Sequence, residues 1–292
     1  MSKLTINRNI IILHFTVLIW GFTGVLGELI SIPAMPLVWY RVFIAAISIY
    51  VYYVFTKRSL KVTKQQLWQY LGVGMLVGLH WVLFFHAIKI STVSVTLVTL
   101  SSLTLFTAIL EPIINRKSVS VSDILVGLLI IFGIYLIFKF EFQYFWGITF
   151  GLLCAFVASI FSIFNARMVK KGDAAAITFY EMLGAWVGVS VVMLLGGQFD
   201  EHMFLNTKDL FFLLVLGVGC TAIAYVLGVA VMKELSAFTV ALTTNLEPIY
   251  GILLALLIFG QKEAMSSGFY MGAGIILAAV FIYPYLKSKI RF

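Results

Sequence analysis

The chain alternates between long apolar runs and short polar connections, and this alternation is what most constrains its fold. Ten runs each come close to the ~20 residues that a helix needs to cross the hydrocarbon core of a bilayer. They span residues 10–29, 37–55, 67–88, 92–114, 121–140, 145–166, 174–195, 210–232, 235–259 and 267–286. With 62% hydrophobic and 11% charged residues, the chain has more apolar surface than a soluble domain buries. The sequence therefore predicts an all-α integral membrane protein with ten transmembrane helices.

Lysine and arginine are distributed unevenly between the two sides of the predicted membrane. With an inside N-terminus, 15 of them fall in inner segments and four in outer segments. The inner residues are Lys3, Arg8, Lys57, Arg58, Lys61, Lys64, Arg116, Lys117, Arg167, Lys170, Lys171, Lys233, Lys287, Lys289 and Arg291; the outer ones are Lys89, Lys139, Lys208 and Lys262. Short cytoplasmic loops are enriched in these residues. We therefore expect a multi-pass protein of the cytoplasmic membrane with both termini in the cytoplasm, and the net charge of +8 indicates topology rather than nucleic-acid binding.

The two halves of the chain repeat each other. The segment Leu-Gly-Val-Gly at 71–74 recurs at 216–219, an offset of 145 residues, and the same offset pairs Ser91 with Ser236. Because each half holds five runs, an odd number, the second half must be inverted relative to the first. Inverted repeats are typical of secondary transporters, whose substrate sites lie near the midplane between the repeats. The predicted domains are residues 1–143 and 144–292, arranged around a central cavity.

Several short motifs resemble those of a known family. They are Ile-Trp-Gly-Phe at 19–22, Tyr-Arg at 40–41, Phe-His-Ala-Ile-Lys at 85–89, Asn-Leu-Glu-Pro at 245–248 and Gly-Gln-Lys-Glu at 260–263. On these motifs the chain resembles the EamA family of the drug/metabolite transporter superfamily over nearly its whole length. The first half departs from the pattern with Asn-Arg-Lys at 115–117, where a Gly-Glu end is common. The resemblance implies two inverted five-helix repeats around a central cavity, and export or exchange of metabolites such as amino acids, without naming the substrate.

Glu247 is the strongest candidate for a functional residue. It lies 12 residues from either end of its run, or ~18 Å along a helix, which places it near the midplane. A carboxylate facing lipid there would cost roughly 2.5–3.5 kcal/mol, so it must face protein or water. Pro248 leaves the Thr244 carbonyl without a donor. We expect Glu247, Thr244 and Asn245 to line the substrate cavity, with Glu247 coupling transport to protons; the structural alternative is that Glu247 caps the freed backbone or bridges helices.

Arg41 and Glu181 are the other charged residues well inside predicted runs, and the repeat aligns them. Each lies ~10 Å deep, but from opposite faces of a core ~30 Å thick, so a direct pair is disfavoured. We expect Arg41 to pair with Glu28 at the outer end of the first run, and Glu181 to lie nearer Arg167 or Lys170. These ion pairs would be structural or would act as gates.

Aromatic and histidine side chains near the middle of other runs could complete a cavity. His80 could relay protons or act as a neutral hydrogen-bonding group. The repeat offset places Tyr225 opposite His80. Trp20 and Trp81 could line the cavity, although contact with lipid or packing between helices is equally ordinary.

Small polar residues and cysteines inside the runs carry weaker signals. Thr99 and Ser102 follow helical spacing in the fourth run, so they either line the path or bond across helices. Cys154 and Cys220 lie within apolar runs, which favours small buried side chains over a disulfide or a metal site.

The chain lacks the motifs that would indicate enzymatic chemistry. The sequence contains no phosphate-binding loop, nucleophile elbow or zinc-protease motif. We therefore expect a transporter without catalytic residues, metal or cofactor, whose partners are a small metabolite, the lipid bilayer and protons. A passive facilitator or channel of the same fold is the main alternative, and a membrane-embedded enzyme is a third.

Overall fold

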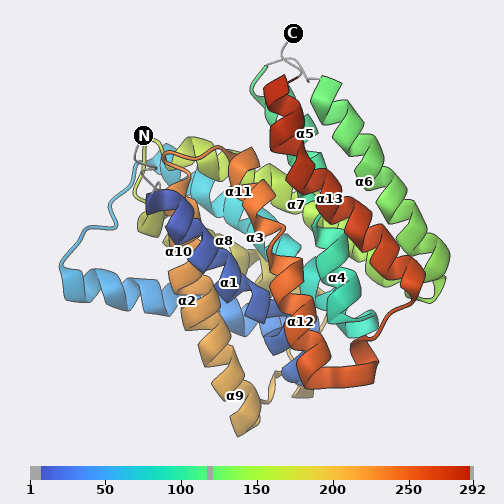
Figure 1. Cartoon of the computed structure of the whole chain (residues 1–292). Helices are drawn as coiled ribbons and strands as arrows, with labels where there is room; N and C mark the ends of the chain where they lie inside the picture. Colours follow the sequence, from blue (N-terminus) through green and yellow to red (C-terminus); the bar gives the residue numbers. More distant parts are fainter. Residues whose placement is uncertain (1–7, 117–120, 290–292) are drawn as a thin grey trace.

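The computed structural model describes residues 8–116 and 121–289, and every regular element in these ranges is a helix (Figure 1). The elements are α1 (Arg8–Leu29), α2 (Ala34–Thr56), α3 (Lys64–Ile90), α4 (Val93–Leu100), α5 (Leu103–Ile114), α6 (Val121–Phe140), η1 (Phe142–Tyr144), α7 (Phe145–Met168), α8 (Ala174–Leu195), η2 (Glu201–Met203), α9 (Thr207–Leu214), η3 (Val215–Ile223), α10 (Ala224–Val231), α11 (Ala237–Thr244), α12 (Glu247–Phe259), η4 (Gly260–Glu263) and α13 (Ser267–Lys289). Lys3, Lys117, Arg291 and the terminal Phe292, which enter the topology argument, lie outside the described residues.

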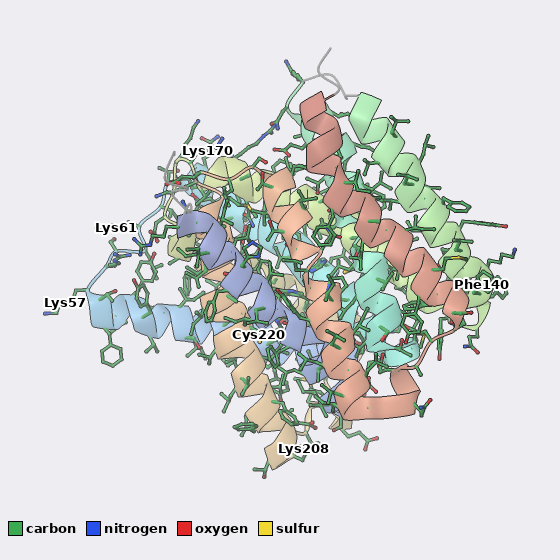
Figure 2. The ribbon with its side chains drawn as sticks, in the orientation of Figure 1. Lys57, Lys61, Phe140, Lys170, Lys208 and Cys220 are labelled. Carbon is green, nitrogen blue, oxygen red and sulfur yellow. The ribbon has the colours of Figure 1, made fainter. Side chains whose placement is uncertain are left out.

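The predicted membrane-spanning fold is confirmed. Within the described residues, eight helical stretches are long and apolar enough to cross a membrane, and α6 and α13 add the shorter apolar segments Leu125–Phe140 and Ser267–Tyr283. Large apolar side chains such as Phe55, Leu195 and Leu257 are each 83% exposed. Figure 2 shows side chains projecting outwards from many of the helices, and exposed apolar side chains are expected on surfaces that contact lipid rather than water.

Three of the predicted continuous runs are interrupted in the structure. The fourth run breaks between α4 and α5 and the ninth between α11 and α12, while the eighth contains the π-helical segment η3. Hydroxyl groups at the first break bond to nearby carbonyls, with Ser102 Oγ 2.7 Å from Thr99 O, which competes with regular helical bonding. Pro248 follows the second break and cannot donate to the Thr244 carbonyl. These breaks open the backbone near the centre of the molecule.

Close helix packing surrounds this centre. At the contact between α3 and α8, a Cβ added to Gly74 would lie 2.2 Å from the Glu181 carbonyl oxygen, and one added to Gly184 would lie 2.2 Å from the Leu71 carbonyl oxygen. Only glycine allows the two backbones to approach so closely. The α6 and α13 helices instead pack on each other at one side of the molecule (Figure 1). The centre is therefore formed mainly by the other spans.

Candidate functional site

A cavity of about 90 Å³ lies among the interrupted spans. One water molecule needs roughly 10–15 Å³ of such space, so the cavity has room for several. Its walls come from both halves of the chain and combine a few charged or polar groups with many aromatic and aliphatic ones. The lining residues are Trp20, Thr23, Arg41, His80, Trp81, Phe84, Leu100, Leu103, Ala158, Phe161, Ser162, Asn165, Tyr225, Gly228, Val229, Met232, Val240, Ala241, Thr244 and Glu247.

Glu247 lines this cavity from the first residue of α12, directly after the break. Glu247 is 6% exposed. Its carboxyl forms no hydrogen bond with the described parts of the chain. Thr244 lines the cavity one turn earlier, but its hydroxyl donates to the Val240 carbonyl at 2.9 Å. The Glu247 carboxyl is therefore open to a partner from the cavity.

Arg41 faces the same cavity from α2 and is 1% exposed. Its Nε donates to Thr221 Oγ1 at 2.7 Å, and its guanidinium carbon lies 4.0 Å from the centre of the Trp81 ring. The Thr221 hydroxyl in turn donates to the Leu216 carbonyl across a π-helical turn. Arg41 Nη1 is buried and has no hydrogen-bond partner among the described residues. Arg41 and Glu247 therefore line the same cavity, from α2 and α12.

The predicted ion pair between Arg41 and Glu28 is wrong. Glu28 instead pairs with Lys262, whose side chain reaches it at the end of the molecule beyond α12. The long Arg41 side chain turns towards the cavity because Thr221 and the Trp81 face hold its guanidinium there.

The predicted pairing of Glu181 with Arg167 or Lys170 is also wrong. Arg167 Nη2 donates to the Ile114 carbonyl at 2.6 Å and Arg167 also bonds Asn115. Glu181 is fully buried and accepts a hydrogen bond from Asn165 Nδ2 at 3.4 Å. Asn165 Nδ2 also lies 3.0 Å from the Tyr225 hydroxyl. Glu181 therefore supports the cavity wall through polar neighbours, without an ion pair in the described ranges.

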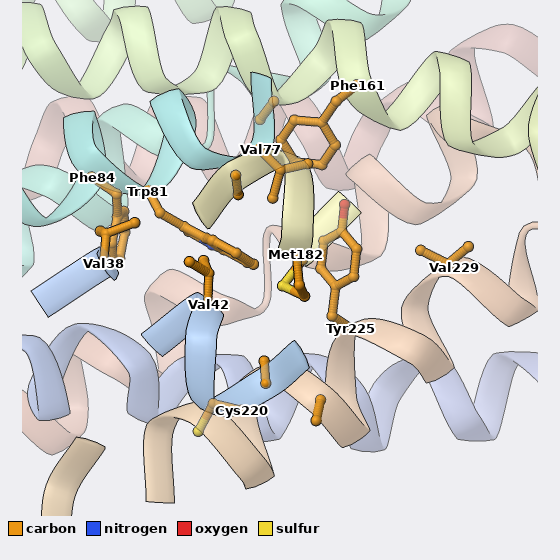
Figure 3. Packing of buried hydrophobic residues seen from close by; sticks show 14 of the residues in the cluster. Val38, Val42, Val77, Trp81, Phe84, Phe161, Met182, Cys220, Tyr225 and Val229 are labelled. Carbon is orange, nitrogen blue, oxygen red and sulfur yellow. The ribbon is translucent and has the colours of Figure 1, made fainter. Parts of the chain in front are cut away.

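Aromatic side chains from separate helices form much of the wall. Trp81 on α3, Phe161 on α7 and Tyr225 on α10 converge in the close view (Figure 3), with the Trp81 and Tyr225 rings 5.6 Å apart. His80 Nδ1 lies 3.1 Å from both the carbonyl oxygen and the Sγ of Cys154. Trp20 closes the wall against Gly228, where an added Cβ would lie 2.8 Å from the indole. His80 is therefore held against Cys154 at the edge of the cavity.

Comparison with known proteins gives the family. The model of the EamA-like transporter family matches the chain twice, over residues 8–139 and 145–283. The chain belongs to the EamA-like transporter family. An uncharacterized transporter from Archaeoglobus fulgidus is 22% identical over 284 residues, covering 94% of this chain and 97% of that protein. A solved crystal structure shares the fold with a TM-score of 0.71 at 14% identity, covering 96% of this chain and 98% of that one.

Membership confirms the family resemblance and the class of the fold. An EamA-like transporter has ten helices in two repeats, and this chain is accordingly a multi-pass membrane transporter.

Three predicted cavity residues of this EamA-like transporter do not line the cavity. Thr99 and Ser102 are fully buried and donate to carbonyls of their own helix segment. Asn245 turns away and donates from Nδ2 to Thr104 Oγ1 at 2.6 Å and to the Ala241 carbonyl at 2.8 Å. Small polar side chains in a span form hydrogen bonds with nearby backbone carbonyl groups. These bonds hold the side chains away from the cavity.

One residue of the site and one feature of the repeat escaped the prediction. Asn165 lines the cavity and links Tyr225 to Glu181, and its position as an amide inside an apolar run was a usable signal. The segment Leu-Glu-Pro-Ile at 110–113 recurs at 246–249, so Glu111 in the first repeat stands before a proline as Glu247 does. That offset is 136 residues, which is why an alignment fixed at 145 hides it.

Proposed function

We propose that this EamA-like transporter exports or exchanges small polar metabolites, amino acids or related compounds, by alternating access. The observation that carries the proposal is a cavity holding one cation and one carboxylate with unused bonding capacity. Arg41 Nη1 lacks a partner in the described structure, and the Glu247 carboxyl accepts no hydrogen bond there. A buried charge without a partner is costly, so each group favours a ligand of opposite charge.

A substrate with a carboxylate and an ammonium group satisfies both residues. Its carboxylate would bind the Arg41 guanidinium, whose planar fork suits carboxylates, and its ammonium would bind Glu247. Trp20, Trp81 and Phe84 offer an apolar wall for the rest of the molecule. The modest cavity volume favours a small metabolite over a large one.

Proton coupling follows from the same carboxylate. A proton and the substrate ammonium compete for Glu247, so binding of one displaces the other. This competition supports exchange of an entering proton for a leaving substrate, with Glu247 as the coupling residue.

The orientation is part of the proposal. We place residues 1–143 and 144–292 as the two inverted repeats and both termini in the cytoplasm. Lys61 and Lys170, both predicted to be inner, lie near each other in Figure 2, and Lys208, predicted to be outer, lies at the opposite end. This separation of basic residues supports the orientation through the positive-inside rule.

Competition for transport in proteoliposomes tests the substrate class. A labelled amino acid should be displaced by other small amino acids, but poorly by analogues that lack either the carboxylate or the amine. Glu247→Gln should weaken competition by amine-bearing compounds, and Arg41→Gln should weaken competition by carboxylate-bearing ones. Equal competition by neutral analogues, unchanged in both variants, would show that the charged pair does not select the substrate.

A further inference from the structure

A groove separate from the substrate cavity lies between α3 and α7, and the two share no lining residue in the described part of the chain. Its volume is about 780 Å³, within the range of clefts that hold an organic molecule. The helix α3 belongs to the first half of the chain and α7 to the second. A ligand in this groove would therefore contact both halves.

Polarity changes along the groove. Its polar lining residues lie in the first turns of α3 and at or just after the end of α7; they are Gln66, Gln69, Arg167, Lys170 and Lys171. Further along α3, and one turn earlier on α7, the walls are formed by Gly72, Val73, Leu76 and Phe164. Leu76 comes 10 residues after Gln66, or ~15 Å along the helix. A phospholipid has the same order, with a charged headgroup followed by apolar chains.

The basic residues of the groove indicate the charge of its ligand. Lys170 and Lys171 are exposed, and neither forms a salt bridge with a described residue. Arg167 is held in place, because its Nη2 donates to the Ile114 carbonyl at 2.6 Å and its Nε donates to Asn115 Oδ1 at 3.1 Å. Positive charge therefore gathers at the polar end of the groove.

No acidic side chain offsets this charge among the described residues that line the groove. The nearest acidic residue in the sequence is Asp173, two positions after Lys171. Its carboxylate already accepts hydrogen bonds from the Ala176 N–H at 3.1 Å, at the start of α8, and from the Tyr53 hydroxyl. The polar end of the groove is therefore complementary to an anion.

Trp68 places this end of the groove at the membrane surface. It lines the groove and is 65% exposed, and tryptophan is enriched where a bilayer meets water. Lys170 lies at the same end of the molecule as Lys61 in Figure 2. The polar end is thus at the depth of lipid headgroups, and the apolar part of the groove faces the acyl chains.

Gly72 leaves space in the apolar part of the groove. A Cβ added to Gly72 would meet no atom within 4 Å. Gly74, two residues later, is packed against α8 instead, where an added Cβ would lie 2.2 Å from the Glu181 carbonyl oxygen. The space beside Gly72 is therefore available to an acyl chain.

We propose that the groove between α3 and α7 binds an anionic phospholipid. The lipid phosphate binds Lys170 and Lys171 beside Arg167, and an acyl chain runs past Gly72 towards Leu76. Basic pockets between membrane helices on the cytoplasmic side are suited to anionic headgroups. The assignment to the inner leaflet rests on the proposed orientation, whereas the site itself depends on neither the orientation nor the transported substrate.

Native mass spectrometry of the purified full chain tests the site. The protein is titrated in detergent with phosphatidylglycerol or with phosphatidylcholine of the same acyl chains, and the affinity for the first bound lipid is measured. The wild type should bind phosphatidylglycerol more tightly. A basic residue near an anionic lipid surface contributes about fivefold to binding, so combining Lys170→Gln with Lys171→Gln should weaken phosphatidylglycerol binding by about thirtyfold. Phosphatidylcholine binding should not change.

The matched control removes two positive charges outside the groove. Lys57 and Arg58 follow α2, are exposed, and do not line the groove. The combination of Lys57→Gln with Arg58→Gln changes the net charge by the same amount and should keep the wild-type affinity for phosphatidylglycerol.

Gly72→Leu tests the apolar part of the groove. The new side chain would occupy the open space beside α3, so it should weaken phosphatidylglycerol binding while the protein still folds. Inorganic phosphate at the same concentration as the lipid should not displace phosphatidylglycerol, because it lacks the apolar chains.

Equal wild-type affinities for the two lipids, or an equal loss in the control at Lys57 and Arg58, would overturn the lipid site. Displacement by inorganic phosphate, together with unchanged binding in Gly72→Leu, would also overturn it and would identify a site for a free anion. These measurements use no transported compound, so a failed lipid site leaves the substrate competition intact, and a wrong substrate assignment leaves the lipid result intact.

Discussion

Replacing Arg41 with lysine should weaken substrate binding without removing the positive charge. Arg41 uses Nε to hold Thr221 at 2.7 Å, stacks its guanidinium 4.0 Å from the Trp81 ring centre, and keeps Nη1 for the cavity. A lysine ammonium cannot hold Thr221, cover the indole and bind a carboxylate in the same fixed geometry. A hydrogen bond to a charged group contributes about 1.5–3 kcal/mol.

That energy corresponds to a loss of roughly 10–150-fold in affinity, since 1.4 kcal/mol is a factor of ten. The assay is the concentration of unlabelled amino acid that halves labelled uptake in proteoliposomes. Lys208→Gln, at the far end of α9 from the cavity, is the control and should match the wild type. If Arg41→Lys also matches the wild type in affinity, Arg41 does not hold the substrate carboxylate and its role is to anchor η3.

Other parts of the account lead to further predictions. Glu247→Gln should fold and insert but lose transport driven by an imposed pH gradient, while Glu247→Asp should keep part of it with an altered pH optimum; a Gln variant with wild-type flux and pH profile would remove Glu247 as the coupling residue. Gly184→Ala should lower stability by about 1–3 kcal/mol in thermal unfolding, because its new Cβ would lie 2.2 Å from the Leu71 carbonyl oxygen. Gly72→Ala, with nothing within 4 Å of the new Cβ, should be neutral or gain up to about 1 kcal/mol from helix propensity; equal losses at both sites would contradict the close-packing argument. A reporter fused after Phe292 should behave as a cytoplasmic marker, and a periplasmic signal would break the ten-span topology.

The sequence predicted the spans well because crossing a bilayer imposes a length and a composition on every helix. The runs 121–140 and 174–195 coincide with α6 and α8, and the other limits differ by only a few residues. The interruptions were harder to predict. The helices α4 and α5 separate at Ser101 and Ser102, and serine residues also occur inside continuous helices. Pro248 gave a local signal for a break, and the structure has one beside it.

The partners of the charged side chains could not be predicted from the depth of each residue along its helix. Depth correctly discouraged a direct Arg41–Glu181 pair, but it also assigned Arg41 to Glu28. Depth ignores the reach of a side chain and the partners that neighbouring helices provide. Thr221, which bonds across a π-helical turn, holds Arg41 at the cavity, and Lys262 in η4 pairs with Glu28 although the two residues are 234 positions apart in the sequence.

The polar residues of spans four and nine show a second limit of sequence-based inference. Thr244 and Glu247 line the cavity, whereas Thr99, Ser102 and Asn245 bond to neighbouring backbone or to Thr104. All five are polar residues in apolar runs, so composition cannot separate them. The difference comes from the helix breaks, which turn some side chains towards the cavity and others into the packing between helices.

Counterflow in proteoliposomes tests the central claim most directly. Vesicles loaded with an unlabelled small amino acid should take up the labelled compound faster than empty vesicles, because a carrier with alternating access returns more quickly when it is loaded. Labelled flux that is independent of substrate on the opposite side would contradict alternating access and would identify a passive facilitator or channel of the same fold.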